Sequence, residues 1–177
     1  GNLAASAGEG LAALARREDL RVRIGNHHHV AVFARDELAL GAALAETRLD
    51  RFTKPGPRVV ACPGTRWCAH GLADTGRLAA AVRERLAGVA AGNVLIAISG
   101  CPNGCSHSAV ADVGAIGVVA GSAADRREAW NLSAGGERGQ GPRLAQPVAG
   151  RVSPDEAAAK IVELAVQAAA SGPAGRE

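Results

Sequence analysis

The chain has 177 residues, a formal net charge of +3 and a pI of about 8.9. This positive charge is weak and scattered, so we expect no nucleic-acid partner. No apolar run reaches the roughly 18 residues that a membrane span needs. The first ten residues also lack the basic and apolar segments of a secretory signal.

Two further features of the composition concern the origin of the chain. It contains no methionine, so we expect a fragment, a processed product or the product of a truncated gene. Without a signal segment we expect a cytoplasmic, reducing environment. In such an environment the four cysteines indicate metal binding or catalysis more than disulfides.

The first part of the sequence predicts a small α+β domain. Residues 9–18 are rich in helix formers, and residues 36–46 predict a second helix with acidic residues in its first turn. Between them, residues 20–33 predict two strands around a Gly-Asn turn. The Lys-Pro-Gly-Pro segment at 54–57 breaks the chain, so we expect a first domain over residues 1–55.

The second domain, residues 56–177, is predicted to be a sheet with helices. We expect strands at 58–61, 93–99, 113–120 and 128–132, helices at 69–87 and from 153 to about 170, and a loop at 134–151 rich in Gly, Pro and Arg. Leu72, Leu78, Val82 and Leu86 are available for one face of the first of these helices. Ser153-Pro154-Asp155-Glu156 predicts a capping box at the start of the second.

The four cysteines form two local pairs. Cys62 and Cys68 have five residues between them, Cys101 and Cys105 have three, and 32 residues separate the pairs. Each pair follows a predicted strand and lies among Pro and Gly residues. Such loops hold thiolates at strand ends and leave backbone N–H groups free to approach sulfur.

Three interpretations of the pairs compete. A structural zinc site uses four thiolates, but its pairs are usually two to four residues apart. Two disulfides are a second interpretation, which the expected compartment disfavours. A [4Fe–4S] cube is larger than one zinc ion and accepts wider spacings. Spacing alone does not decide among them.

The residues around the cysteines resemble a known family. ACPGTRWCAHGLADT followed by ISGCPNGCSHSAVADVGAIG is similar to the signature of the sirohaem-dependent nitrite/sulfite reductases, Cys-x5-Cys and then Cys-x3-Cys with a small-residue-rich stretch. Residues 3–50 resemble the ferredoxin-like half-domain of that family, and the stretch from Trp130 to Gly136 resembles the turn after its cluster loops.

The resemblance implies two cofactors. Cys62, Cys68, Cys101 and Cys105 would bind a [4Fe–4S] cluster, and Cys105 would also ligate the sirohaem iron. Asn103 and Gly104 would let the backbone approach the cofactor closely. Sulfite to sulfide and nitrite to ammonia each require six electrons, so a cluster next to the haem iron suits such a reaction.

The resemblance also implies that the chain is incomplete as a catalyst. It corresponds to the second of two related halves, and the cationic residues that bind substrate lie largely in the first. Expected partners are that N-terminal half, sulfite or nitrite, and an electron donor such as ferredoxin or a flavoprotein. Two alternatives stay open: a precorrin-3B synthase-like monooxygenase of cobalamin synthesis, and a non-enzymatic module that binds a cluster or zinc.

Arginines are the expected partners of the sirohaem carboxylates. Arg21 and Arg23 share one face of a predicted strand and lie where the family bears a strand arginine facing the haem. Arg66 lies inside the first cysteine loop, where it could contact a propionate. Guanidinium groups pair well with carboxylates, but a surface position for each arginine is the alternative.

Other residues near these motifs have simpler expected roles. The run His27-His28-His29 could ligate metal, but we expect a polar strand near solvent or a cofactor edge. For Trp67 we expect packing rather than chemistry. For His70 and His107, each close to a cysteine in sequence, we expect solvent exposure or a hydrogen bond to sulfur rather than ligation.

Overall fold

The structure is a computed structural model that describes residues 5–25, 29–52, 56–138 and 141–171. The chain divides into two compact units, Asn2–Pro55 and Gly56–Glu177. The division lies within the segment 54–57 where the sequence predicts a break. Among the described residues, no helix is both long enough and apolar enough to cross a membrane.

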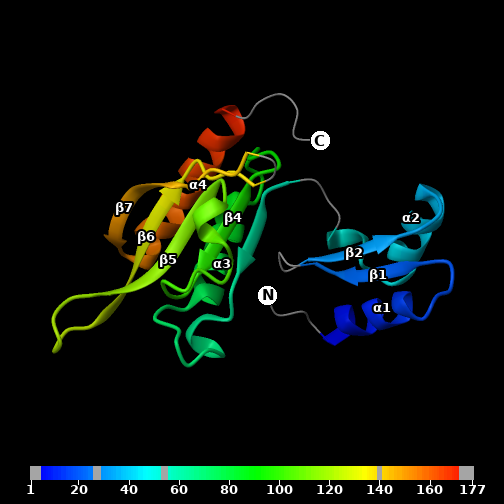
Figure 1. The fold of residues 1–177 in the computed structure, drawn as a ribbon, viewed down its shortest axis with the longest axis horizontal. Coiled ribbons are helices and arrows are strands. Elements are labelled where there is room, and N and C mark those ends of the chain that lie inside the picture. Colours follow the sequence, from blue (N-terminus) through cyan, green and yellow to red (C-terminus); the bar gives the residue numbers. More distant parts are fainter. Residues whose placement is uncertain (1–4, 26–28, 53–55, 139–140, 172–177) are drawn as a thin grey trace. The chain divides into compact units, whose positions relative to one another are not determined.

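The first unit is a two-stranded sheet with two helices (Figure 1). Its elements in chain order are α1 (Ala5–Ala15), β1 (Arg21–Ile24), β2 (Val30–Phe33), α2 (Glu37–Glu46) and the short 3₁₀ helix η1 (Asp50–Phe52). The strands are antiparallel, with Arg21 opposite Phe33. Asp36 caps α2, because its carboxylate accepts a hydrogen bond of 2.7 Å from the backbone of Ala39.

Helix α1 differs from its predicted range of 9–18. It begins at Ala5 and ends at Ala15, before the two arginines that follow. The side chain of Arg17 bonds to Asp19 at 2.8 Å and to Glu46 of α2 at 3.2 Å. The guanidinium group lowers the pKa of the Asp19 carboxyl through this hydrogen bond. The polar residues after Ala15 thus join α1 to its neighbours instead of extending it.

The second unit is built on a five-stranded sheet in sequence order (Figure 1). Its strands are β3 (Arg58–Ala61), β4 (Leu95–Ser99), β5 (Val113–Ala120), β6 (Arg127–Ala134) and β7 (Gln146–Val152). The first three strands are parallel, and β6 and β7 continue the sheet antiparallel. Two short 3₁₀ helices, η2 (Gly64–Arg66) and η3 (Ser108–Val110), follow β3 and β4.

Two helices, α3 (Thr75–Leu86) and α4 (Pro154–Ser171), cover one face of this sheet (Figure 1). They pack with Ile96 and Ile98 of β4 and with the fully buried Trp130 of β6 in the main core. Leu95 and Ala97 point to the other face of β4, where they pack against Ala111. The connection from β4 to β5 therefore crosses the face opposite α3 and α4. That connection carries Cys101 and Cys105.

Helix α3 begins six residues later than the sequence predicts. Its first helical residue is Thr75, because the Asp74 carboxylate caps it by accepting a 3.0 Å hydrogen bond from the backbone of Arg77. Leu72, which we expected on the helix face, lies before the helix and is 39% exposed. Residues 69–74 instead complete the first cysteine loop.

The prediction of a loop over residues 134–151 is wrong for residues 146–151. β7 forms there and pairs with β6, with register shifts between Trp130 and Leu132 and between Leu132 and Ser133. It is an edge strand that is mostly exposed. Its sequence contains Pro147 and Gly150, which weaken a strand pattern. This segment forms a strand because it pairs with β6, and its own residues do not predict one.

The predicted capping box at the start of α4 is confirmed. The Ser153 hydroxyl and backbone N–H both donate to the Glu156 carboxylate, at 2.7 and 2.9 Å. The backbone of Glu156 donates back to the Ser153 hydroxyl at 3.4 Å. These hydrogen bonds lower the pKa of Glu156, led by the one from the Ser153 side chain.

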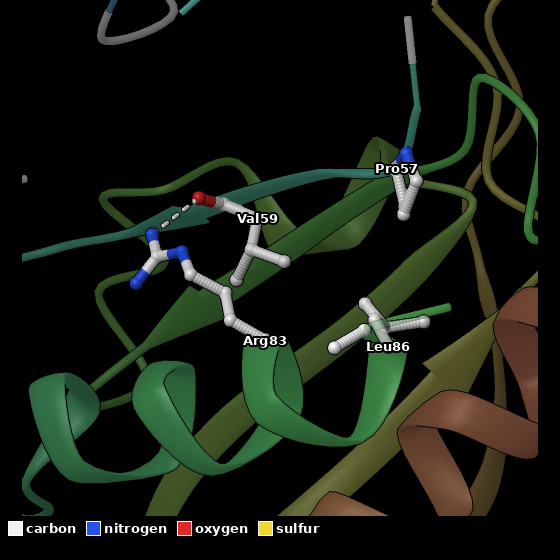
Figure 2. A pocket seen from close by; sticks show the side chains of 5 residues that line it. Pro57, Val59, Arg83 and Leu86 are labelled. Carbon is white, nitrogen blue, oxygen red and sulfur yellow. Dashed lines mark hydrogen bonds between the residues drawn. The ribbon is translucent and has the colours of Figure 1, made fainter. Parts of the chain in front are cut away.

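A small pocket of about 250 Å³ lies between β3 and the C-terminal half of α3 (Figure 2). Arg83 reaches across it and donates to the carbonyl oxygen of Val59 at 2.9 Å. Burial lowers the pKa of this guanidinium. Because β3 pairs only with β4 in the sheet, this contact occupies part of its open edge. The pocket lies beside residues 57–59, whereas Cys62 follows the other end of the strand.

Candidate metal centre

The topology of the sheet brings the two cysteine pairs to one edge. Cys62 directly follows β3, and Cys101 comes two residues after β4. These strands are parallel neighbours, so their carboxyl ends lie together. The backbone N–H of Cys62 donates to the carbonyl oxygen of Ile98 at 3.1 Å, which fixes the start of the first loop beside the end of β4.

The first cysteine loop, residues 62–74, is a compact turn built around η2. The backbone N–H of Cys68 donates to the carbonyl of Gly64 at 3.0 Å and closes the loop on itself. The hydroxyl of Thr75, the first residue of α3, donates to the carbonyl of Cys62 at 2.6 Å. The backbones of Cys62 and Cys68 are therefore both fixed by hydrogen bonds within this loop and to the start of α3.

The backbones of the two loops touch through glycine residues. The carbonyl of Gly100 accepts hydrogen bonds from Leu72 at 2.8 Å and Ala73 at 3.2 Å. A Cβ atom on Gly100 would stand only 3.0 Å from the Cα of Gly64, which has a φ of +59°. A Cβ atom on Gly117 of β5 would stand 2.7 Å from the Gly100 carbonyl oxygen. Side chains larger than hydrogen would separate the loops.

The cysteine sulfurs have different surroundings. The Cys62 sulfur accepts a 3.1 Å hydrogen bond from the backbone N–H of Gly100 in the other loop. Cys101 is buried, Cys62 and Cys68 are half-buried, and Cys105 is exposed. Hydrogen bonds from backbone N–H groups to sulfur are among the contacts by which a protein tunes a bound cluster.

The structure also concerns the two alternatives to a cluster, which are disulfides and a single zinc ion. No disulfide joins any of the four cysteines, all of which lie in the described part of the chain. Within that part, no three Cys, His, Asp or Glu side chains come close enough to hold a single metal ion. The two loops together supply four thiols, the all-cysteine ligand set that a [4Fe–4S] cube uses.

The second cysteine loop turns through two residues with positive φ. Gly104 has a φ of +65°, and His107 adopts a left-handed conformation with a φ of 60°. The N–H of His107 donates to the Gly104 carbonyl at 2.7 Å. The conformation of Gly104 accounts for a glycine at this place. Asn103, which we expected beside the cofactor, is exposed next to it.

Three large side chains of the first loop are exposed to solvent. Arg66 and His70 are exposed, and Trp67 is 73% exposed. The expectation that Trp67 packs in this chain is therefore wrong. The loop is held by backbone bonds and by Thr75, so its large side chains are not needed for its core.

The remaining predicted site residues lie in the first unit. Arg21 and Arg23 are exposed on one face of β1, while Val22 between them packs on the core. His29 is exposed before β2. His27 and His28 lie outside the described residues.

The part of the chain that carries both cysteine loops matches a known protein family. The family model of the nitrite and sulphite reductase 4Fe–4S domain matches residues 57–168, which is more than half of the chain. The chain belongs to this family. The match covers both cysteine loops and nearly the whole second unit, and it confirms the resemblance found in the sequence.

Individual members of the reductase family match parts of the chain. An assimilatory-type sulfite reductase from Nitratidesulfovibrio vulgaris is 38% identical over 100 residues, which are 56% of this chain and 42% of that protein. An assimilatory ferredoxin-dependent nitrite reductase from Haloferax mediterranei is 32% identical over 147 residues, which are 78% of this chain and 25% of that protein. The chain thus spans less than half of either relative.

Solved structures confirm the predicted α+β fold. The Mycobacterium tuberculosis NirA protein matches with a TM-score of 0.75 at 19% identity, over 99% of this chain and 35% of that chain. Dissimilatory sulfite reductase I matches with a TM-score of 0.67 at 11% identity, over 92% of this chain and 59% of that chain. Membership of the reductase family supports the two predicted cofactors, a [4Fe–4S] cluster and sirohaem.

A carboxylate that the sequence alone does not reveal supports the first loop of this reductase domain. Glu128 of β6 accepts hydrogen bonds from the backbone of Asp74 at 2.8 Å and from the indole N–H of Trp130 at 3.2 Å. It thereby connects the end of the loop to the sheet. An acidic residue two positions before a tryptophan was the available signal, but only the fold shows that Asp74 is beside it.

We expect Glu128→Ala to lower the free energy of unfolding by about 2 kcal/mol, because a buried indole N–H and a backbone N–H lose their acceptor. Thermal or urea unfolding would measure the loss. Asp125→Ala is the control, since Asp125 pairs with Arg127 at 3.8 Å and both side chains are more than 70% exposed. That variant should stay within about 0.5 kcal/mol of the parent. Equal losses in the two variants would contradict this role of Glu128.

Proposed function

We propose that this chain is the C-terminal, cluster- and sirohaem-binding part of a sulfite or nitrite reductase. The observation that carries the proposal is the meeting of two cysteine loops at the carboxyl ends of neighbouring parallel strands, inside the matched 4Fe–4S domain. The relatives named above as sulfite and nitrite reductases support the reaction class.

Within this proposal each cysteine has a role. Cys62, Cys68, Cys101 and Cys105 hold the [4Fe–4S] cluster, and Cys105 is also the axial ligand of the sirohaem iron. The exposure of Cys105 supports this division, because a thiolate shared by two groups needs open space on more than one side. The half-buried and buried sulfurs suit ligation of the cluster alone.

The chain's own groups would hold and tune these cofactors. When bound, the cluster stores electrons beside the haem iron, which suits a reduction that takes six electrons from donors that deliver them singly. The Gly100 N–H, 3.1 Å from the Cys62 sulfur, would favour the reduced cluster by stabilising added negative charge. Arg66 is exposed in the first loop and free to pair with a carboxylate of the sirohaem.

The first unit has a supporting role in the proposal. We assign residues 1–55 to the ferredoxin-like half-domain and residues 56–177 to the cluster and sirohaem domain. Val22 packs on the core of this unit, whereas Arg21 and Arg23 lie on the exposed face of β1. That exposed face suits contact with a cofactor carboxylate or with the N-terminal half of the same enzyme.

The partners of the whole enzyme extend the proposal. Sulfite or nitrite would be the substrate, and its binding residues would lie in the N-terminal half. A ferredoxin or a flavoprotein would donate electrons. The name of the Haloferax mediterranei relative indicates a ferredoxin for that protein. The expected cytoplasmic location stays a prediction. Among the described residues, no contact favours a precorrin-3B synthase-like reaction or a non-enzymatic role over this one.

The test is the metal content of the anaerobically prepared chain. We expect about four irons and four acid-labile sulfides per chain, because one Cys₄ site holds one cube. An absorption spectrum of the full-length parent should add the Soret and red bands of sirohaem. Stoichiometric zinc instead of iron would contradict the proposal, and a cluster without haem bands would favour an electron-transfer module.

A further inference from the structure

Three buried serines enclose the second cysteine loop. Ser99 is the last residue of β4 and precedes the loop, while Ser106 and Ser108 follow Cys105. Each of the three is 1% exposed. The proposed function gives them no role, although fully buried serines are uncommon without one.

All three serines meet at one oxygen atom. The Ser99 hydroxyl lies 2.6 Å from the Ser106 hydroxyl and accepts a 3.2 Å hydrogen bond from the Ser106 backbone N–H. It also accepts a 3.3 Å hydrogen bond from the Ser108 hydroxyl. The chain on both sides of the Cys101–Cys105 segment is thus tied to a single side chain on the sheet.

The donor in the hydrogen bond between the Ser99 and Ser106 hydroxyls can be assigned by counting the hydrogen bonds that Ser99 accepts. A serine hydroxyl has one hydrogen to donate and two lone pairs to accept. The Ser106 backbone and the Ser108 hydroxyl occupy both lone pairs of Ser99. The Ser99 hydrogen must therefore be donated to the Ser106 oxygen. Ser99 makes all three hydrogen bonds that its hydroxyl allows.

The position of this network shows what it holds. β4 presents its apolar side chains to both faces of the sheet, and Ser99 ends that strand where the chain leaves for the other face. The connection to β5 contains only the short η3, so no long helix fixes its path. Hydrogen bonds to Ser99 supply that fixation seven residues further on, just after Cys105.

We propose that Ser99 is a positioning residue that holds the Cys101–Cys105 loop in its ligand-binding conformation before a cluster is present. The inference rests on the proposed function and deepens it, because it explains how two of the four thiolates are arranged in advance. Ser108 contributes one bond to the network and Ser99 contributes all of them. The two serines should therefore differ in importance although both are buried.

The test uses the cluster-free 177-residue chain and measures alkylation of each cysteine by iodoacetamide at one pH, with peptide mass spectrometry. Cys101 is 8% exposed, so its alkylation requires local opening of the loop. In Ser99→Ala we expect the rate at Cys101 to rise about tenfold, because three polar groups lose their partner. The rate at Cys68, which lies in the first loop, should stay within about twofold of the parent.

Ser108→Ala is the matched control and should raise the Cys101 rate less than about threefold, since only one bond is lost. An unchanged Cys101 rate in a folded Ser99→Ala chain would overturn the proposal. Equal acceleration at all cysteines would overturn it too, because the serine would then support the fold in general. If Ser99→Ala does not fold, Ser106→Ala provides the same comparison with the Ser99 bond to the Ser106 backbone retained.

A second measurement separates this inference from the proposed function. In chains reconstituted with iron and sulfide, Ser99→Ala should lose its absorption to an iron chelator faster than Ser108→Ala. If the parent chain binds no cluster at all, the proposed function fails. The alkylation pattern would then still decide whether Ser99 positions the loop.

Discussion

If Cys105 holds both the cluster and the sirohaem, as proposed above, replacing it by serine in the complete enzyme is expected to disturb two chromophores at once. The cluster would lose a soft thiolate ligand, and the haem iron would lose the thiolate that couples it to the cluster. Replacing a residue that only hydrogen-bonds to a metal ligand typically lowers activity by about 10- to 100-fold. Replacing the ligand itself should therefore lower the activity at least about 100-fold. Optical and electron paramagnetic resonance spectra of identically reconstituted proteins would measure both effects.

Cys62→Ser is the matched variant for this comparison. Cys62 is half-buried, and its sulfur accepts the Gly100 N–H, so its replacement should damage the cluster first. The haem spectrum should change only afterwards, as the loop loses its structure. An unaltered haem spectrum and unaltered coupling in Cys105→Ser would show that Cys105 does not join the two groups.

Gly71→Ala is expected to unfold the first cysteine loop. A Cβ atom at this position would stand 2.6 Å from the backbone nitrogen of Thr65 and 2.7 Å from the carbonyl carbon of Gly64. Both neighbours are backbone atoms of the same tight turn, so neither can rotate away. We expect a loss of about 3 kcal/mol in the free energy of unfolding and a decrease in Tm of roughly 6–12 °C.

Gly76→Ala controls for the change of residue type. Gly76 lies in α3, where the nearest atom to an added Cβ is a side-chain oxygen of Asp74 at 3.3 Å. Alanine favours helix by up to about 1 kcal/mol, so this variant should be as stable as the parent or more so. Fluorescence of the fully buried Trp130 can follow unfolding of the second unit. A Gly71→Ala chain with the Tm of the parent would refute the close-packed loop.

The elements that could be predicted are those whose own residues carry a clear pattern. The apolar run before the second cysteine pair forms β4, in which all five residues are buried. The Ser-Pro-Asp-Glu motif starts α4 where its capping chemistry requires. The cysteine loops lie at strand ends, as Pro and Gly beside each pair indicated.

Contacts between distant segments could not be predicted in this way. β7 is an exposed edge strand with a proline and a glycine, and only pairing with β6 makes it a strand. Leu72 continued the apolar pattern of α3, but Asp74 caps the helix after it. The partners of Glu128 and Ser99 depend on tertiary structure, since 54 residues separate Glu128 from Asp74.

The parallel pairing of β3 and β4 has a consequence for the order of assembly. Cys62 and Cys101 lie 39 positions apart in the sequence, with α3 between them, and they come together only when these strands pair. Contacts of such sequence separation form late in folding, and a chain emerging from the ribosome grows by about 5–20 residues per second. For the first seconds of its existence, the nascent polypeptide displays one thiol pair without the other. A protein that delivers a cluster would thus find all four cysteines together only after β3 and β4 have paired.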